Sequence, residues 1–236
     1  MLLCNKPWRN ADELTVPRQL RLKLRRPPSF ARSDFVHSPT NEAALKALDA
    51  WPAWHGGCLA LIGPEGSGKT HLAREWASRV RAFAPAAGIR DLGDLHGQPV
   101  VLEDADQADG ETLFHLINMA GAGGGLLLTS RLAPRDWPAA LPDLRSRLAA
   151  LPVAVLGEPD DLVLEGVLRK FFRERNIKPA EDVYPYLIRR IERSVKRARE
   201  VVTRLDEAAD AEERDITRAL ARQILESEED SPNLFE

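Results

Sequence analysis

Cysteines and long apolar runs are scarce in this chain of 236 residues. The two cysteines, Cys4 and Cys58, have no ligand spacing, so the sequence predicts neither a zinc site nor a disulfide framework. No apolar run approaches the roughly 18 to 20 residues that a membrane helix needs. Polar residues follow the first apolar ones almost at once, unlike the core of a signal peptide. We therefore expect a cytoplasmic protein without a membrane segment, in which Cys58 is an inert core thiol.

Positive and negative side chains are nearly balanced in number. The formal net charge is −3 and 44% of the residues are hydrophobic, as in ordinary soluble proteins. Basic residues nevertheless gather near the N-terminus: Arg18, Arg21, Lys23, Arg25, Arg26 and Arg32. Such a cluster marks either a nucleic-acid contact or a solvated arm. Aromatic residues for base stacking are nearly absent there, with Trp8 and Phe30 the exceptions, so a nucleic-acid binder that uses this arm is the least favoured hypothesis.

Four short apolar runs alternate with amphipathic helical patterns in the first two thirds of the chain. The runs are residues 58–63, 99–104, 125–130 and 152–157. Buried runs this short are typical of parallel strands, and the helical patterns between them predict an α/β fold with helices on both faces of the sheet. A fifth strand is indicated near residues 87–92.

After residue 158 the strand pattern stops and only helical patterns follow. The predicted parts are an extended, proline-interrupted arm (1–35), an α/β core (36–157), a helical bundle (158–226) and a mobile acidic tail (227–236). A capped amphipathic helix opens the core, with Ser38 or Thr40 available as its N-cap.

The segment GPEGSGKT, residues 63–70, fits the phosphate-loop pattern G-x-x-x-x-G-K-[ST] between a predicted strand and a predicted helix. Glycines let backbone N–H groups turn toward an anion, and the helix that begins at Lys69 adds the positive end of its dipole. Lys69 would reach the β- and γ-phosphates of a nucleotide, and the Thr70 hydroxyl would ligate Mg²⁺. The predicted nucleotide-binding residues of the loop are Gly63, Pro64, Glu65, Gly66, Ser67, Gly68, Lys69 and Thr70.

A pair of carboxylates ends the next predicted strand. Glu103 falls where the metal-side acid of such a site normally lies, holding Mg²⁺ through water, and Asp104 falls at the catalytic acid position. The usual order of aspartate and glutamate is reversed at these two positions, so each side chain differs by one methylene from the usual one. This difference shifts a carboxylate oxygen by more than about 1 Å, whereas catalytic geometry is held to about 0.5 Å. Binding of Mg-nucleotide is expected and its turnover is left open; the alternative is that both acids face solvent.

These motifs resemble those of the AAA+ ATPases, and more narrowly those of their DnaA branch. The loop continues as GKTHLA, so His71 matches the histidine of that branch's GKTHL segment. LFHLINMA resembles its F-F-H-x-x-N helix through Phe114, His115 and Asn118. LLLTSRLAPRDW is similar to its sensor 1 segment, and LPDLRSRLAA to its box VII segment. The resemblance covers about residues 30 to 225 and implies a AAA+ P-loop core followed by a helical lid.

The resemblance implies that Arg147 of box VII is an arginine finger, which projects toward the nucleotide of a neighbouring molecule. Arg145 is the competitor for this role, and a surface salt bridge is the alternative for either. Phe35 and Val36 match the apolar wall of the adenine pocket.

Two sensor positions depart from the family pattern. Thr129 lies in sensor 1, but Arg131 stands where an acidic residue is common. The match to the sensor 2 arginine is Lys196, with Arg197 beside it, and a lysine offers a point charge without a planar fork. Both departures favour holding nucleotide, ADP in particular, with weak or no turnover.

A DnaA initiator would continue into a helix-turn-helix DNA-binding domain, whereas this sequence ends after the lid pattern. In this it resembles the Hda-type regulatory inactivators of DnaA. The arm segment QLRLKL is similar to the peptide through which such proteins bind the sliding clamp. An extended strand would put Leu20, Leu22 and Leu24 on one side, while the Gln19 amide satisfies polar groups at a pocket rim. An edge strand on the chain's own core, or a linker, is the alternative.

The expected function is a nucleotide-dependent regulator of DNA replication initiation that stimulates ATP hydrolysis by DnaA and prevents re-initiation. Its expected cofactors are ADP or ATP and Mg²⁺. Its expected partners are the DnaA initiator, the beta-subunit sliding clamp of the DNA polymerase and other copies of itself in a homo-oligomer, without sequence-specific DNA binding or a membrane. The alternative is a AAA+ helicase loader or transposition-helper ATPase that hydrolyses its own ATP.

Overall fold

The structure, a computed structural model, describes residues 29–84, 95–212 and 214–229. Its strands are β1 (Cys58–Ile62), β2 (Pro99–Leu102), β3 (Gly125–Ser130) and β4 (Val153–Val155). Its α-helices are α1 (Glu42–Asp49), α2 (Lys69–Val80), α3 (Gly110–Gly121), α4 (Pro142–Ala150), α5 (Asp161–Glu174), α6 (Val183–Ile188), α7 (Val195–Glu212) and α8 (Arg218–Glu229). Short 3-10 turns lie at η1 (Arg32–Asp34), η2 (His55–Gly57), η4 (Ala105–Gln107) and η5 (Pro134–Asp136). None of the helices in these ranges is both long and apolar enough to cross a bilayer.

The four strands form one parallel sheet in the order β2-β3-β1-β4. Each coincides with one of the four apolar runs, so the α/β prediction is confirmed. Every residue of the central strand β3 is buried, which explains why its sequence is apolar without alternation. The fifth strand expected at residues 87–92 lies outside the described residues; at this edge Phe83 makes an isolated parallel bridge to Val100 of β2.

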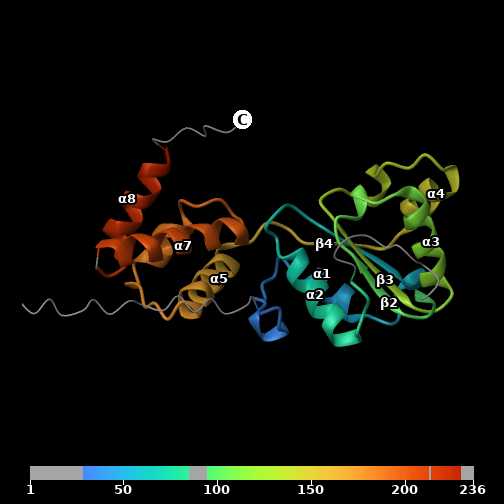
Figure 1. The fold of residues 1–236 in the computed structure, drawn as a ribbon, viewed down its shortest axis with the longest axis horizontal. Coiled ribbons are helices and arrows are strands. Elements are labelled where there is room, and N and C mark those ends of the chain that lie inside the picture. Colours follow the sequence, from blue (N-terminus) through green and yellow to red (C-terminus); the bar gives the residue numbers. More distant parts are fainter. Residues whose placement is uncertain (1–28, 85–94, 213, 230–236) are drawn as a thin grey trace, which may run out of the picture.

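Helices cover both faces of the sheet (Figure 1). On one face α1 and α2 enclose a hydrophobic cluster in which Trp76 is fully buried and stacks on Trp54, with ring centroids 5.0 Å apart. On the other face α3 and α4 pack a second cluster through residues such as Leu116 and Leu144. Cys58 belongs to this second cluster at 2% exposure, and burial raises the pKa of its thiol to about 11. Its neutral, buried thiol agrees with the expectation of an inert core residue.

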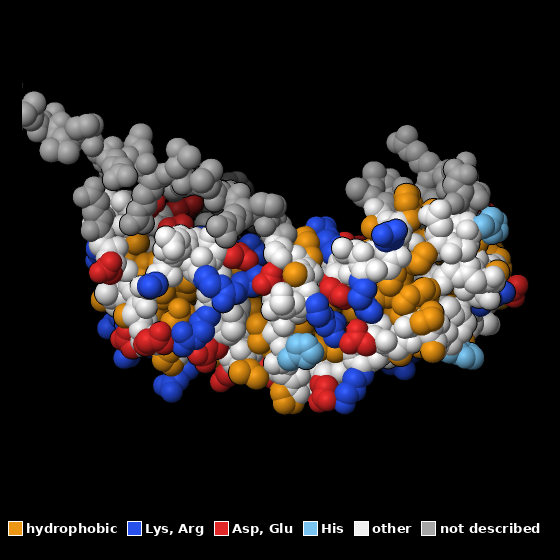
Figure 2. Space-filling view, turned by 90° about the horizontal axis from the view of Figure 1, so that it is seen from below, with side chains coloured by type: hydrophobic (Ala, Val, Ile, Leu, Met, Phe, Trp, Pro, Cys, Tyr) orange, Lys and Arg blue, Asp and Glu red, His pale blue; other side chains and the backbone are white. Residues whose placement is uncertain are grey.

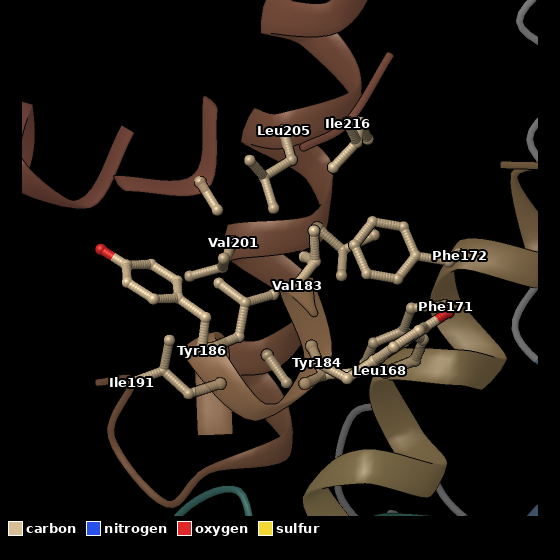
Figure 3. Close-up of a cluster of buried hydrophobic side chains, with 14 of the residues drawn as sticks. Leu168, Phe171, Phe172, Val183, Tyr184, Tyr186, Ile191, Val201, Leu205 and Ile216 are labelled. Carbon is tan, nitrogen blue, oxygen red and sulfur yellow. The ribbon is translucent and has the colours of Figure 1, made fainter. Parts of the chain in front are cut away.

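Helices α5 to α8 form a lid with a hydrophobic cluster of its own (Figure 3). Phe172 is fully buried there and meets Tyr184 edge-on at 5.9 Å, while Val201 and Leu205 of α7 fill the space between the helices. Helix α8 runs to Glu229, so the first three positions of the predicted acidic tail are helical.

The N-terminus of α1 differs from the predicted cap. Asn41 occupies the N-cap position, and the hydroxyls of Ser38 and Thr40 bond to each other at 2.7 Å instead of capping the helix. The Asn41 side chain turns backward, accepting from the Ser38 N–H at 3.1 Å and donating to the Val36 carbonyl at 2.9 Å. Thr40 also donates to Asp160 at the start of α5, at 3.2 Å. These polar groups fix the segment between core and lid, a demand that the helix pattern alone does not reveal.

Candidate nucleotide-binding site

The loop between β1 and α2 has the backbone conformation of an anion cradle. Gly66 and Gly68 have φ of +72° and +102°, a region that side chains other than glycine rarely adopt. A Cβ atom at Gly68 would lie 3.1 Å from the Phe35 ring, and one at Gly66 would overlap the Ser194 hydroxyl. Ser67 is 7% exposed, and its Oγ atom has no hydrogen-bond partner within the described parts of the chain. An orphaned hydroxyl beside two glycine-only positions fits a phosphate group.

Lys69, the first residue of α2, curves back over this loop. Its Nζ atom donates to the carbonyls of Gly63 at 2.8 Å and Pro64 at 2.7 Å. Burial lowers the pKa of Lys69, and the nearby Arg131 charge lowers it further, while Asp104, Glu65 and Asp106 act in the opposite direction. The ammonium group is therefore partly desolvated at the loop mouth, where a phosphate charge would compensate it.

The structure separates the two predicted strand-end acids. Glu103 lies in an ion pair with Arg74 of α2, with its Oε1 3.3 Å from the arginine Nε. Asp104 has φ of +50°, and its N–H donates to the Thr129 hydroxyl at 3.3 Å, which links the ends of β2 and β3. The charge of Asp104 raises the pKa of Lys69.

A third acid, Asp106, also faces this end of the sheet, and the sequence analysis did not single it out. Its Oδ1 atom accepts from the Ser130 hydroxyl at 2.7 Å. Burial raises the pKa of Asp106, but the hydrogen bonds from Ser130 and Gln107 outweigh burial and hold that pKa below its usual value. The spacing E-D-A-D in the sequence is the signal that would have found it.

The residues at the two predicted sensor positions, Lys196 and Arg131, both contact the phosphate loop. Lys196 of α7 donates to Glu65 at 2.7 Å, and Arg131, after β3, pairs with the same carboxylate at 3.1 Å. Arg197, the other sensor 2 candidate, points toward Glu200 at 3.6 Å. The Val195 N–H donates to the Gly66 carbonyl at 2.9 Å, so the N-terminus of α7 rests directly on the loop.

The predicted adenine-wall residues lie between the loop helix and the lid. The Phe35 ring packs against His71 of α2, with centroids 5.4 Å apart. Val36 contacts Gly166 of α5 so closely that a Cβ atom at this glycine would lie 2.7 Å from it. His71 also lies 3.1 Å, Nε2 to oxygen, from the Ala31 carbonyl, which holds this stretch on α2.

Mg²⁺ would reach this site together with phosphate oxygens. Thr70 is exposed at the start of α2, and from there its hydroxyl would ligate the ion. Within residues 29–84, 95–212 and 214–229 no group of three or more His, Cys, Asp or Glu side chains is arranged to hold a metal ion by itself. Mg²⁺ is usually bound through one or two carboxylates together with substrate phosphates.

Arg147 lies at the other end of the sheet. It is exposed on α4 and lines a cavity of about 250 Å³ together with Asn118, Cys58 and Pro152. Cys58 is the first residue of β1, and the phosphate loop follows its last residue. Five residues at about 3.3 Å each separate the two ends by roughly 16 Å. Arg147 therefore lies at the far end of the sheet from the nucleotide site of its own chain.

Some of the remaining predicted residues lie in the described part of the chain and others lie outside it. Arg145 of α4 donates to the carbonyl of Ala139, in the segment before the helix, at 3.1 Å. Phe114 and His115 lie in edge contact on α3 at 6.1 Å. The clamp-binding residues Gln19, Leu20, Leu22 and Leu24 lie outside the described residues.

A glycine-rich phosphate loop, a parallel sheet with the order β2-β3-β1-β4 and a helical lid over the loop define an α/β AAA+ fold. The chain is similar in structure to domain III of the replication initiation protein DnaA from Thermotoga maritima: TM-score 0.68, 19% identity, 85% of this chain and 97% of that chain covered. It is also similar to DnaA bound to AMPPCP and single-stranded DNA, with TM-score 0.62, 16% identity and coverage of 79% and 69%.

The Thermotoga maritima RuvB Holliday junction branch migration motor is similar as well, with TM-score 0.65, 15% identity and coverage of 84% and 72%. No protein-family model matches the chain. At these identities the similarities show the fold.

Proposed function

We propose that this chain is a nucleotide-dependent regulator of replication initiation, of the Hda type, which binds ADP or ATP with Mg²⁺ and stimulates ATP hydrolysis by DnaA. The observation that carries the proposal is the position of Arg147, exposed on α4 at the end of the sheet away from its own phosphate loop. A guanidinium placed there serves the nucleotide of a neighbouring molecule. Stimulated hydrolysis in DnaA then switches the initiator off and prevents re-initiation.

Nucleotide binding is supported by the glycine cradle, the orphaned Ser67 hydroxyl and the partly desolvated Lys69. The Gly66 to Val195 hydrogen bond couples this cradle to the lid. A bound nucleotide would thus fix the lid relative to the core and with it the surface offered to a partner. DnaA structures with AMPPCP bound share this fold.

Charges of both signs share the face of the molecule that Figure 2 draws. On the side drawn in Figure 2, Lys and Arg side chains are interspersed with Asp and Glu. In the lid, Arg169 pairs with Glu181 at 2.8 Å. A DNA-binding surface would instead show clustered basic residues.

The test is an ATPase assay with purified DnaA, sliding clamp loaded on DNA and this protein. Arg147→Ala should reduce stimulated hydrolysis at least tenfold, because an arginine finger contributes about 10³ to 10⁵ in rate in GTPases. Arg145→Ala is the matched control on the same helix and should stimulate normally. Full stimulation by Arg147→Ala would contradict the finger role.

The clamp contact is tested in the same assay. A Gln19→Ala, Leu20→Ala double variant should lose pull-down by the clamp and clamp-dependent stimulation, whereas Arg147→Ala should still bind the clamp. Retained clamp binding by the double variant would remove the arm from the proposal.

A second candidate function is a helicase loader or transposition helper that hydrolyses its own ATP. It is favoured by Asp104, a carboxylate that acts on the Lys69 charge beside the phosphate loop. Steady-state turnover by the isolated protein separates the two. Robust hydrolysis that is lost in Asp104→Asn would favour the loader.

A further inference from the structure

Glu65 is the single acid of the phosphate loop, and it lies between two cations from different parts of the chain. Its Oε1 atom accepts from Lys196 of the lid at 2.7 Å, and its Oε2 atom lies 3.1 Å from Nη2 of Arg131, which follows β3. Each cation uses a different oxygen of the carboxylate. Glu65 thus pairs at the same time with the residues at both predicted sensor positions.

This carboxylate lies beside the lysine that would bind the terminal phosphates of a nucleotide. Lys69, whose amine in such loops reaches the β- and γ-phosphates, donates at 2.7 Å to the carbonyl of Pro64, the residue next to Glu65. The charges of Lys69 and Glu65 act on each other. A third phosphate placed near this amine would meet the negative charge of Glu65 and the two cations that Glu65 already holds.

The two ion pairs of Glu65 are exposed to solvent and not buried. The side chain of Glu65 is 48% exposed, and those of Lys196 and Arg131 are both 64% exposed. Ion pairs at this exposure are weak because water competes for both partners. The hydrogen bond between Lys196 and Glu65 is the main reason that the pKa of the carboxyl is lowered and that of the amine is raised, so both stay charged near neutral pH.

We propose that Glu65 sets the preference of this site for a nucleoside diphosphate over a triphosphate. The inference rests on the nucleotide binding proposed above. A diphosphate uses the loop amides and Lys69 and leaves the pairs of Glu65 intact. A triphosphate has to displace Glu65 from Arg131 and Lys196 and lies beside its negative charge.

The experiment is titration calorimetry with ADP and with the non-hydrolysable triphosphate AMPPCP, each with Mg²⁺, on the full chain. Glu65→Gln should raise the affinity for AMPPCP relative to ADP about three- to tenfold, the range expected for releasing two exposed ion pairs. Glu181→Gln, which removes an exposed carboxylate paired with Arg169 at 2.8 Å in the lid, is the matched control and should leave the ratio unchanged.

A double-mutant cycle tests whether Glu65 changes the nucleotide preference through Lys196. Lys196→Gln should change AMPPCP affinity little in the wild-type background, because Glu65 already occupies this amine, and should reverse part of the gain in the Glu65→Gln background. Additive effects would overturn the role of Lys196 in the preference.

The remaining outcomes separate the two proposals. An unchanged ratio in Glu65→Gln with binding retained, or an equal loss for both nucleotides, would overturn this inference and leave the proposed function standing. If the folded wild-type protein took up neither nucleotide, the proposed function would fail, and the inference with it.

Discussion

The guanidinium of Arg147 lies over the ring of Phe114, with its central carbon 5.1 Å from the ring centroid. The two residues come from the segments that resemble box VII and the F-F-H-x-x-N helix, and they pack together on α4 and α3. A cation over an aromatic face at an exposed site gains about 0.5 to 1 kcal/mol. The ring thus orients an exposed arginine toward the surface that we assign to the partner.

Phe114→Leu should therefore weaken the stimulation of DnaA about two- to fivefold, because it removes the ring face but keeps an apolar side chain. Nucleotide affinity should not change, since Phe114 packs on Arg147, at the other end of the sheet from the phosphate loop. The order parameter of the Arg147 side-chain Nε–H group, measured by NMR, should fall in this variant. An equally ordered guanidinium would contradict the positioning role of Phe114.

Gly66→Ala should loosen the lid. The substitution places a Cβ atom where the Ser194 hydroxyl lies, at a residue with φ of +72°. Backbone strain costs about 1 to 2 kcal/mol, and displacement of the α7 N-terminus adds to this cost. We expect a lower free energy of unfolding in urea and at least a tenfold loss of nucleotide affinity.

Gly56→Ala provides the matched control, because Gly56 has φ of +62° with no atom within 4 Å of the added Cβ. It should show the strain cost alone and bind nucleotide normally. If the two variants lost stability and affinity alike, contact between the loop and the lid would not matter for binding.

His71 should make stability fall on the acid side of neutrality. Burial lowers its pKa, and the charge of Lys170 lowers it further, while the hydrogen bond to Ala31 and the charges of Asp34 and Glu75 raise it. Because the folded-state pKa lies below the unfolded value of about 6.5, the neutral ring favours folding above that pH. This contribution is lost as pH falls below about 6.5 toward the folded pKa.

Urea titrations at pH 7.5 and pH 5 would measure this. The wild type should lose more free energy of unfolding between the two than His71→Gln. His115→Gln, a change at an exposed position of α3, serves as the control and should follow the wild type. A His71→Gln variant with the full acid-side loss would assign the effect to other groups.

The sequence predicted the elements because the signals for them are local. A short apolar run such as residues 125–130 is buried on both sides only in the interior of a parallel sheet. The glycines of residues 63–70 are needed wherever the backbone takes positive φ, whatever surrounds the loop. Strands, helices and the phosphate loop were therefore readable without coordinates.

The N-terminus of α1 shows where prediction from neighbouring residues fails. Ser38 and Thr40 satisfy the sequence rule for an N-cap, yet their hydroxyls bond to each other, and Thr40 also reaches Asp160, 120 positions along the chain. A hydroxyl bonds to whichever polar group the fold brings nearest. Sequence distance gives no warning of such a partner.

The amino-acid sequence by itself determined that this chain has a parallel α/β core, a glycine cradle for phosphate and a helical region after it, because each depends on the conformation of consecutive residues. Only the tertiary structure decided that Lys196 and Arg131 both pair with Glu65 of the cradle and that Arg147 lies at the other end of the sheet. Lys196 and Glu65 are 131 positions apart. Charges so far apart interact only where packing of the lid on the core brings them within a few ångströms, and that packing is a property of the whole fold.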